Sequence, residues 1–133
     1  MIVATTIPSS HRDLAEAAGI GVLTTVDPEG LPQSTAIWYK LGDDDIVRIS
    51  LHKSRQKYRN IVAHPLATLF IVDPTNQFRT LEIRAETTLV EDPDASYFET
   101  VVRHYGQDPA TFPAPSDNRV IVTLTPRRVV TNG

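Results

Sequence analysis

Residues 78–91 alternate apolar and polar side chains, and this long stretch constrains the possible fold more than any other feature of the sequence. Leu81, Ile83 and Leu89 fall on one side of an extended strand, whereas Glu82 and Glu86 fall on the other. Such a strand buries one face and leaves the other in contact with water or a partner. The sequence therefore predicts a sheet that is covered on one face.

Three stretches before it have the composition of strands joined by tight turns. Residues 21–26 are rich in β-branched side chains, and the turn signal DPEG at 27–30 leads to a second strand near 33–41. A run of Asp follows Gly42 and marks the next turn, before a third strand at 46–51. These signals predict a meander of antiparallel strands.

The remaining strands lie in the second half of the chain. Residues 66–72 form a continuous apolar run, which predicts a strand buried on both faces. The last two strands, at 120–124 and 128–131, are expected to be separated at Pro126, because proline cannot donate to a sheet ladder.

Three short helices are expected between these strands. Each has a capping side chain at its start and a glycine or proline near its end. They span residues 11–18, 54–63 and 93–105, with Ser9 or Ser10, Ser54 and Asp92 as caps. Because the strands follow one another instead of alternating with helices, residues 1–133 are expected to form one mainly β (α+β) domain, an antiparallel barrel.

The chain has no cysteine, which excludes disulfides, thiolate nucleophiles and iron–sulfur clusters. Its four histidines lack metal-ligand spacing, so no metal is expected. No apolar run reaches the length of a spanning helix, and residues 1–20 do not resemble a secretion signal. We expect a cytoplasmic protein with no membrane partner, and the net charge of −3 also argues against a nucleic-acid partner.

Residues 46–72 contain no Asp or Glu but hold five basic residues: Arg48, Lys53, Arg55, Lys57 and Arg59. Basic side chains at the start of a helix oppose its dipole by roughly 0.3–1 kcal/mol each, and a bound phosphate would reverse that penalty. The segment therefore predicts a phosphate site, in which Arg55 suits bidentate contact and Lys57 a point contact. The alternative is a solvated basic surface that pairs with acidic residues elsewhere.

Several segments together resemble the pyridoxamine-phosphate-oxidase-like split β-barrel superfamily, with an FMN-binding-like fold, and in particular its flavin/deazaflavin oxidoreductase branch that uses coenzyme F420. These segments are GVLTTVDPEGLPQ at 21–33, STAIWY at 34–39, HKSRQKYRNI at 52–61, His64-Pro65, Asp73-Pro74 and LEIRA at 81–85. Many members of the superfamily have glycine where this chain has Ala85, which is a small departure.

The resemblance implies a homodimer whose cofactor lies at the interface, with its phosphate at the basic segment and its ring along residues 33–38. The loop at 73–78 of the second subunit is expected to reach the same pocket. Trp38 is expected in the core or dimer contact more than in the pocket. The candidate cofactor-binding residues are Gln33, Ser34, Thr35, Ala36, Ser50, His52, Lys53, Ser54, Arg55, Lys57, Asn76 and Gln77.

The function implied by the resemblance is an F420H2-dependent reductase that passes a hydride to an unsaturated small organic molecule. Two alternatives stay open. One is a non-catalytic module that holds a flavin, a deazaflavin or haem, and the other is an FMN-dependent enzyme of the pyridoxamine-phosphate-oxidase type. No side chain is assigned as a catalytic acid or base, because no motif for hydrolysis or metal catalysis occurs.

Overall fold

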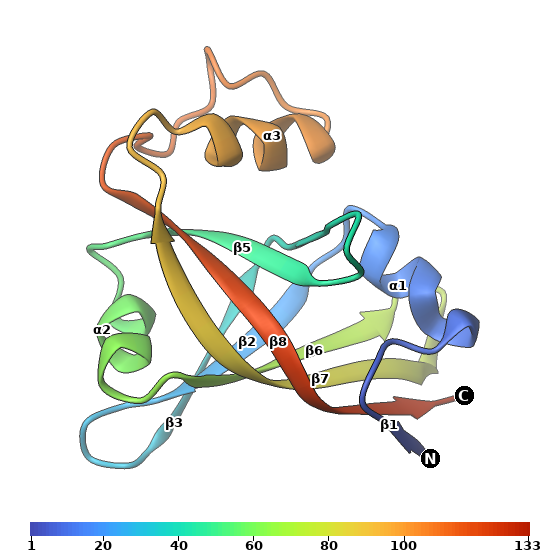
Figure 1. Cartoon of the computed structure of the whole chain (residues 1–133). Helices are drawn as coiled ribbons and strands as arrows, with labels where there is room; N and C mark the ends of the chain where they lie inside the picture. The colour runs from blue at the N-terminus through green and yellow to red at the C-terminus, as the bar shows by residue number, and fades with distance from the viewer.

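Eight antiparallel strands form one sheet that curls into an open barrel (Figure 1). The structure is a computed structural model and describes residues 1–133. The strands are β1 (Ile2–Ala4), β2 (Gly21–Val26), β3 (Pro32–Ile37), β4 (Lys40–Leu41), β5 (Val47–His52), β6 (Leu66–Asp73), β7 (Asn76–Glu91) and β8 (Arg119–Asn132). Their order across the sheet is β3-β2-β6-β7-β8-β5-β4, and β1 pairs with β8. The predicted antiparallel split barrel is confirmed.

The barrel interior follows from the alternation along its strands. In β7 the side chains of Leu81, Ile83 and Ala85 are buried, as the sequence predicts, and Arg84 and Glu86 are exposed. These inward side chains join a core of 19 buried residues drawn from most of the strands and from two helices. The long strand β7 pairs with both β6 and β8, so it organises much of the sheet.

Strand β6 differs from the expectation, which was wrong in placing it between two covered faces. Its burial alternates: Ala67, Leu69 and Ile71 are buried, whereas Leu66 and Val72 are exposed. A barrel wall has one interior face, so an apolar run in it leaves every second side chain on the outside.

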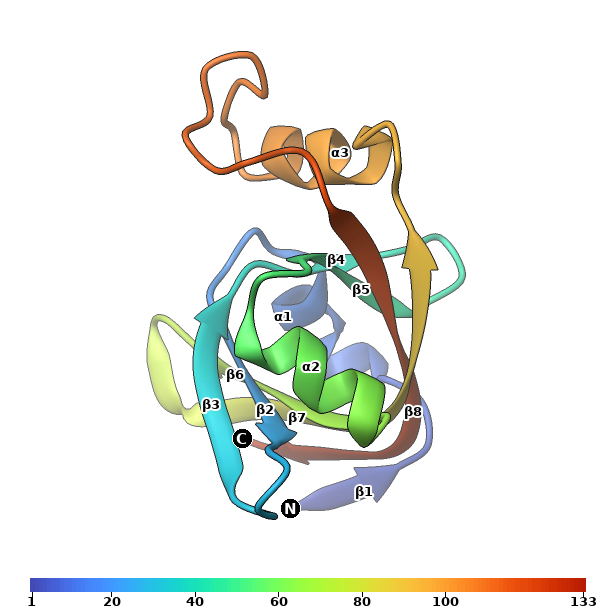
Figure 2. The same cartoon turned by 90° about the vertical axis from the view of Figure 1, so that its left-hand side faces the viewer.

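Three α-helices flank the barrel: α1 (Arg12–Glu16), which follows the 3-10 turn η1 (Ser9–His11), α2 (Gln56–Ala63) and α3 (Ser96–His104). Helices α1 and α2 lie at opposite ends of the curled sheet, and each contributes to the core, through Leu14 and Ile61 (Figures 1 and 2). Helix α3 stands apart, over β5, and builds a small cluster of its own with the loop that follows it (Figure 1). None of these helices is long and apolar enough to cross a membrane.

The predicted helix starts need correction. Ser54 does not cap α2: Arg55 occupies the cap position with extended backbone, and the Ser54 hydroxyl is hydrogen-bonded to Nδ1 of His52 at 2.8 Å. Helix α3 begins at Ser96, later than expected. The carboxylate of Asp92 still accepts N–H groups of its first turn, from Tyr97 and Phe98.

The predicted break at Pro126 is also wrong, because β8 is continuous through it. The register with β7 shifts there, since Ala85 lies opposite Pro126 and Arg84 opposite Arg128. Arg127 is thus an extra residue in a bulge, where a missing backbone N–H is tolerated. The expected strand at 33–41 is instead divided into β3 and β4.

Candidate functional site

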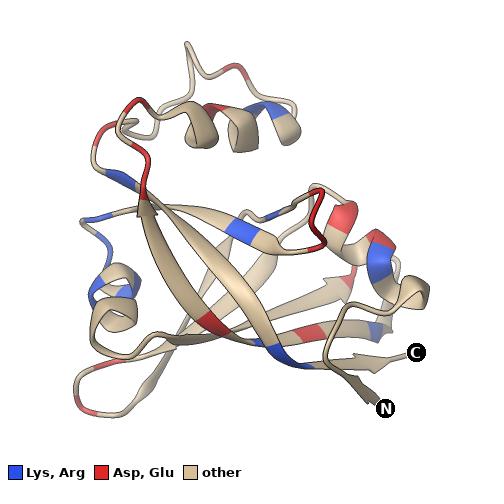
Figure 3. Ribbon diagram, in the orientation of Figure 1, with Lys and Arg blue, Asp and Glu red and all other residues tan.

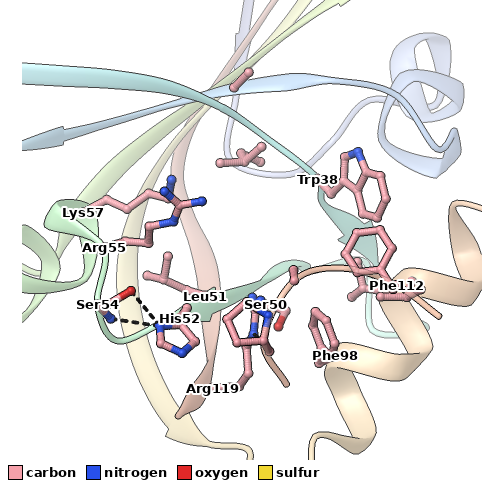
Figure 4. Close-up of a pocket in the computed structure, with 16 residues that line it drawn as sticks. Trp38, Ser50, Leu51, His52, Ser54, Arg55, Lys57, Phe98, Phe112 and Arg119 are labelled. Atoms are coloured by element: carbon pink, nitrogen blue, oxygen red, sulfur yellow. Dashed lines mark hydrogen bonds between the residues drawn. The ribbon is translucent and has the colours of Figure 1, made fainter. Parts of the chain in front are cut away.

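A cavity of about 430 Å³ lies between the barrel and α3 (Figure 4). Its walls come from the end of β3, from β5 and the segment that leads into α2, and from α3 with its following loop. No Asp or Glu lines it. The lining has a cationic part, with Arg55, Lys57 and Arg119, and an aromatic part, with Trp38 and Phe112.

Strand β5 supplies part of the cavity wall because of its alternation. Val47, Ile49 and Leu51 are buried in the barrel core, so Ser50 and His52 point to the other face, toward α3. Nδ1 of His52 is engaged with Ser54, and its Nε2 lies 3.8 Å from the exposed carboxylate of Asp117. The hydroxyl oxygen of Ser50 is buried and has no hydrogen-bond partner in the chain.

The basic segment divides into paired and unpaired residues. Arg48 pairs with Asp44 at 2.7 Å, and Lys53 forms an ion pair with Glu91. No carboxylate oxygen lies within 4.0 Å of a side-chain nitrogen of Arg55 or Lys57. Figure 3 shows the blue cluster at α2 and the segment before it, where no acidic residue lies.

Arg59 also turns away from the cavity, although it belongs to the same helix. Its guanidinium donates to the side-chain oxygen of Gln56 at 2.7 Å and to the carbonyl of Ser54 at 3.2 Å. Arg59 has no carboxylate partner either, but its donors are engaged within the chain, so Arg55 and Lys57 are the cations of the segment that line the cavity without an ion-pair partner.

The backbone at the start of α2 adds further donors. The N–H groups of Gln56 and Lys57 have no acceptor in the chain, as is usual for the first turn of a helix. Free N–H groups beside two unpaired cations fit the oxygens of a phosphate.

Lys57 reaches from α2 toward β3, where its Nζ donates to the hydroxyl of Thr35 at 3.1 Å. Burial lowers the pKa of Lys57, and the nearby charge of Arg55 lowers it further. Both causes disfavour the charged form in the absence of an anion.

The orientation of α2 depends on a buried amide. Asn60 is fully buried, and its Nδ2 donates to the hydroxyl of Thr25 at 3.0 Å and to the side-chain oxygen of Gln33 at 2.9 Å. Its Oδ1 accepts from Gln56 at 2.9 Å. These bonds fix the helix against the β2–β3 hairpin and so fix the place from which Arg55 and Lys57 enter the cavity.

The aromatic part of the lining comes from segments far apart in the sequence. The ring centre of Phe112 lies 5.3 Å from that of Trp38 and 6.0 Å from that of Phe98. Trp38 also stacks on Tyr105, outside the lining. The expectation that the sole tryptophan serves packing is thus incomplete, because its side chain both packs on Tyr105 and lines the cavity.

The candidate residues from the sequence fall into three groups. The first group lines the cavity and comprises Ala36, Ser50, His52, Ser54, Arg55 and Lys57. The second group lies beside the cavity. Gln33 and Thr35 form hydrogen bonds with residues of α2, and Ser34 forms one with Thr24. Lys53 forms an ion pair with Glu91. The third group, Asn76 and Gln77, begins β7 directly after the β6–β7 turn and lines a separate hollow.

Several lining residues were missed from the sequence, and among them Phe98, Phe112 and Arg119 carry aromatic or charged side chains. In the sequence, Phe98 occupies an ordinary apolar position of an amphipathic helix, and Phe112 lies within a proline-rich loop. Arg119 is a lone basic residue at the start of a strand. Nothing local in the sequence indicates that these three meet the basic segment.

A curled antiparallel barrel of this topology is the fold of the pyridoxamine-phosphate-oxidase-like split-barrel superfamily of flavin and deazaflavin oxidoreductases. The chain belongs to the family described as pyridoxamine 5'-phosphate oxidase, which matches residues 7–133. The predicted resemblance is confirmed.

Solved structures agree with this assignment. A protein described as an F420 reductase is 33% identical, with a TM-score of 0.85, and the match covers 93% of this chain and 98% of that one. The conserved hypothetical protein Rv2991 from Mycobacterium tuberculosis is 23% identical with a TM-score of 0.75, and the match covers 97% and 87% of the two chains.

A haem-binding protein from Mycobacterium smegmatis shares the fold at 18% identity and a TM-score of 0.74, with 96% of this chain and 55% of that one covered. No curated protein matches the chain.

Proposed function

We propose that this protein is an oxidoreductase that binds the reduced deazaflavin coenzyme F420 in the cavity and supports hydride transfer to an unsaturated small organic molecule. The observation that carries the proposal is the pair of unpaired cations, Arg55 and Lys57, at the start of α2 in a cavity with no acidic side chain. The likeness to a protein described as an F420 reductase, at 33% identity, supports the choice of this coenzyme over FMN.

In this proposal Arg55, Lys57 and the free N–H groups of α2 bind the phosphate. Ser34, Thr35 and Ala36 on β3 lie next to the flat ring, because small side chains allow a ring to approach the strand closely. When bound, the reduced coenzyme supplies the hydride. The chain binds and orients it, and the aromatic side chains Trp38 and Phe112 exclude water from one side of the ring.

We further propose that the protein is a homodimer. The outward face of β2 and β6 carries large apolar side chains, of which Val22, Leu66 and Val72 are exposed and Phe70 is partly exposed. Val22 lies opposite Ala36 of β3 in the sheet, and Ala36 also lines the cavity. A second copy on this face would therefore cover the rim of the cavity and bury the apolar patch.

The dimer also gives the third group of candidate residues a role. Asn76 and Gln77 begin β7 directly after the β6–β7 turn, outside the cavity of their own subunit. We propose that this turn of the partner contributes to the pocket.

A second candidate is a carrier that binds the coenzyme without using it. The lining contains no carboxylate, and its one imidazole, His52, is bonded to Ser54. A cavity of this kind offers few groups for proton transfer, which is compatible with storage or delivery.

Turnover separates the two candidates. Purified protein with reduced F420 is mixed with a panel of enones, quinones and tetrapyrroles, and the absorbance of oxidised F420 is followed. An oxidoreductase regenerates oxidised F420 with at least one acceptor, at a rate proportional to the enzyme concentration. A carrier binds the coenzyme and leaves its absorbance unchanged with every acceptor. The same experiment with reduced FMN tests the FMN-dependent alternative.

A further inference from the structure

We propose that Arg119 and Ser50 form a second subsite in the cavity, which binds the carboxylate of a planar conjugated acceptor. The inference deepens the proposed function. It rests on that function in one respect, which is that the molecule bound here is the one that the coenzyme reduces. The subsite is distinct from the phosphate site of Arg55 and Lys57, which belongs to the α2 side of the cavity (Figure 4).

Arg119 is held in place by contacts that leave its fork of donors free. Its Nε donates to the carbonyl of Pro115 at 2.9 Å, and its guanidinium lies over the ring of Phe98, with the central carbon 4.1 Å from the ring centre. The two Nη atoms have no hydrogen-bond partner in the chain and no carboxylate within 4.0 Å. A fixed guanidinium loses little freedom when it binds a ligand.

Ser50 supplies an independent sign of a ligand. Its hydroxyl oxygen is buried without a hydrogen-bond partner, although buried polar groups in proteins are nearly always paired. Arg119 lies opposite His52 across the β5–β8 ladder, two positions along β5 from Ser50, and both line the cavity. Figure 4 shows Ser50 and Arg119 between His52 and Phe98.

The balance of charge in the cavity calls for more than one anionic group. Three cations line it, and no carboxylate does. Burial lowers the pKa of Arg119 and the charge of Arg55 lowers it further, whereas Asp117 and Asp92, which lie outside the lining, raise it. The phosphodiester of the coenzyme supplies one negative charge on the α2 side of the cavity. A second anion close to Arg119 would offset the remaining repulsion.

The walls specify the chemistry of this second anion. A guanidinium matches the two oxygens of a carboxylate through parallel N–H donors, and the Ser50 hydroxyl can add a third donor. The ring of Phe98 lies against the Arg119 guanidinium, and the rings of Phe112 and then Trp38 follow it along the cavity wall, which favours a flat apolar body. A conjugated carboxylic acid has both parts.

Binding of two small probes tests the subsite without F420. Trp38 is the sole tryptophan of the chain and lines the cavity, so its fluorescence reports on ligands that enter. We would titrate the protein with cinnamate, with cinnamamide as the uncharged analogue, and separately with inorganic phosphate. The variants are Arg119→Gln, Ser50→Ala and Arg55→Gln.

The wild-type protein should bind cinnamate about tenfold or more tightly than cinnamamide. Arg119→Gln should remove this preference and keep phosphate binding, which also shows that the variant is folded. Ser50→Ala should weaken cinnamate severalfold. Arg55→Gln should show the reverse pattern, with weaker phosphate binding and the cinnamate preference kept.

Equal affinity of the wild-type protein for cinnamate and cinnamamide would overturn the inference. So would loss of the cinnamate preference in Arg55→Gln with its retention in Arg119→Gln, because the cavity would then hold a single anion site. A protein that passes this test but does not bind F420 would refute the proposed function and leave the carboxylate subsite standing.

Discussion

The indole ring of Trp38 lies flat on the phenol ring of Tyr105, with ring centres 4.2 Å apart and planes inclined by 8°. This stack joins the β3–β4 connection to the end of α3. The Tyr105 hydroxyl adds hydrogen bonds to this contact. Its oxygen accepts from the N–H of Tyr39 at 2.9 Å, and its O–H donates to the carbonyl oxygen of Gly19 at 2.7 Å. Together these contacts hold α3 over the barrel and define the aromatic side of the cavity.

Replacing Tyr105 with Phe keeps the stack and removes these hydrogen bonds. The N–H of Tyr39 then loses its acceptor in a partly buried place, so we expect the free energy of unfolding to fall by about 1–3 kcal/mol. Urea denaturation followed by Trp38 fluorescence measures the change. Tyr97→Phe is the matched control, because the Tyr97 hydroxyl has no hydrogen-bond partner in the chain, and this variant should change stability by well under half as much.

Some residues of the basic segment line the cavity and others have side chains engaged elsewhere, and this division predicts which substitutions affect phosphate binding. Arg55→Gln and Lys57→Gln should each raise the dissociation constant for F420 by roughly 10- to 100-fold, the range for a lost charge-assisted hydrogen bond. Arg59→Gln removes the same charge from the same helix, but its guanidinium bonds to Gln56 and to the Ser54 carbonyl instead.

Fluorescence titration of the three variants provides the measurement. Affinity in Arg59→Gln should stay within about threefold of the wild-type value, apart from a small long-range effect of charge. An equal loss in all three variants would mean that general basicity, and not a specific site, attracts the ligand.

The buried position of Lys57 predicts a dependence of stability on pH. Because the pKa of Lys57 is lowered in the folded protein, the unfolded chain binds more protons between that lowered pKa and the ordinary value of 10.5. Stability associated with this group therefore rises with pH through that window. At neutral pH the folded protein bears the full cost of a partly buried charge.

Lys57→Met removes this cost while keeping the length of the side chain. The variant should be more stable than the wild-type protein at pH 7, and its advantage should shrink as the pH rises toward 10.5. Urea denaturation at a series of pH values gives the difference. An advantage that stays constant with pH would show that Lys57 is not the group responsible.

The apolar outer face of β2 and β6 predicts the oligomeric state. Sedimentation analysis should find a dimer for the wild-type chain, and Val22→Lys should shift it toward monomer, because a charge would be buried in the interface. Val62→Lys is the control, since Val62 is equally a large exposed hydrophobic but lies on α2, away from that face. A monomeric wild-type protein would contradict the proposed dimer.

The parts of the fold that depend on local patterning could be predicted from the sequence. The alternation in residues 78–91 correctly assigned the two faces of β7. The strand break predicted at Pro126 was wrong, because a bulge in the β7–β8 ladder is a property of two paired strands and has no local signal in the sequence. The prediction that β6 is buried on both faces was also wrong. Leu66 and Val72 are apolar, so the sequence alone does not distinguish them from core residues, although both are exposed.

The candidate site could be predicted only in part, for a related reason. Arg55 and Lys57 belong to one contiguous basic segment, whose contrast with an acidic chain is visible in the sequence. Whether each is paired is decided by residues far away, such as Glu91 for Lys53. Arg119 and Phe112 join the cavity only because the loop after α3 returns to the start of β8, which pairs with β5.

Equilibrium titration of the purified wild-type chain with F420 and, separately, with FMN tests the central claim most directly. Trp38 fluorescence reports binding of both ligands, and the double variant Arg55→Gln/Lys57→Gln serves as reference. We predict saturable binding of F420, tighter than that of FMN, and its loss by 100-fold or more in the double variant. Tight binding of FMN with none of F420, or F420 binding that is unchanged in the double variant, would contradict the account.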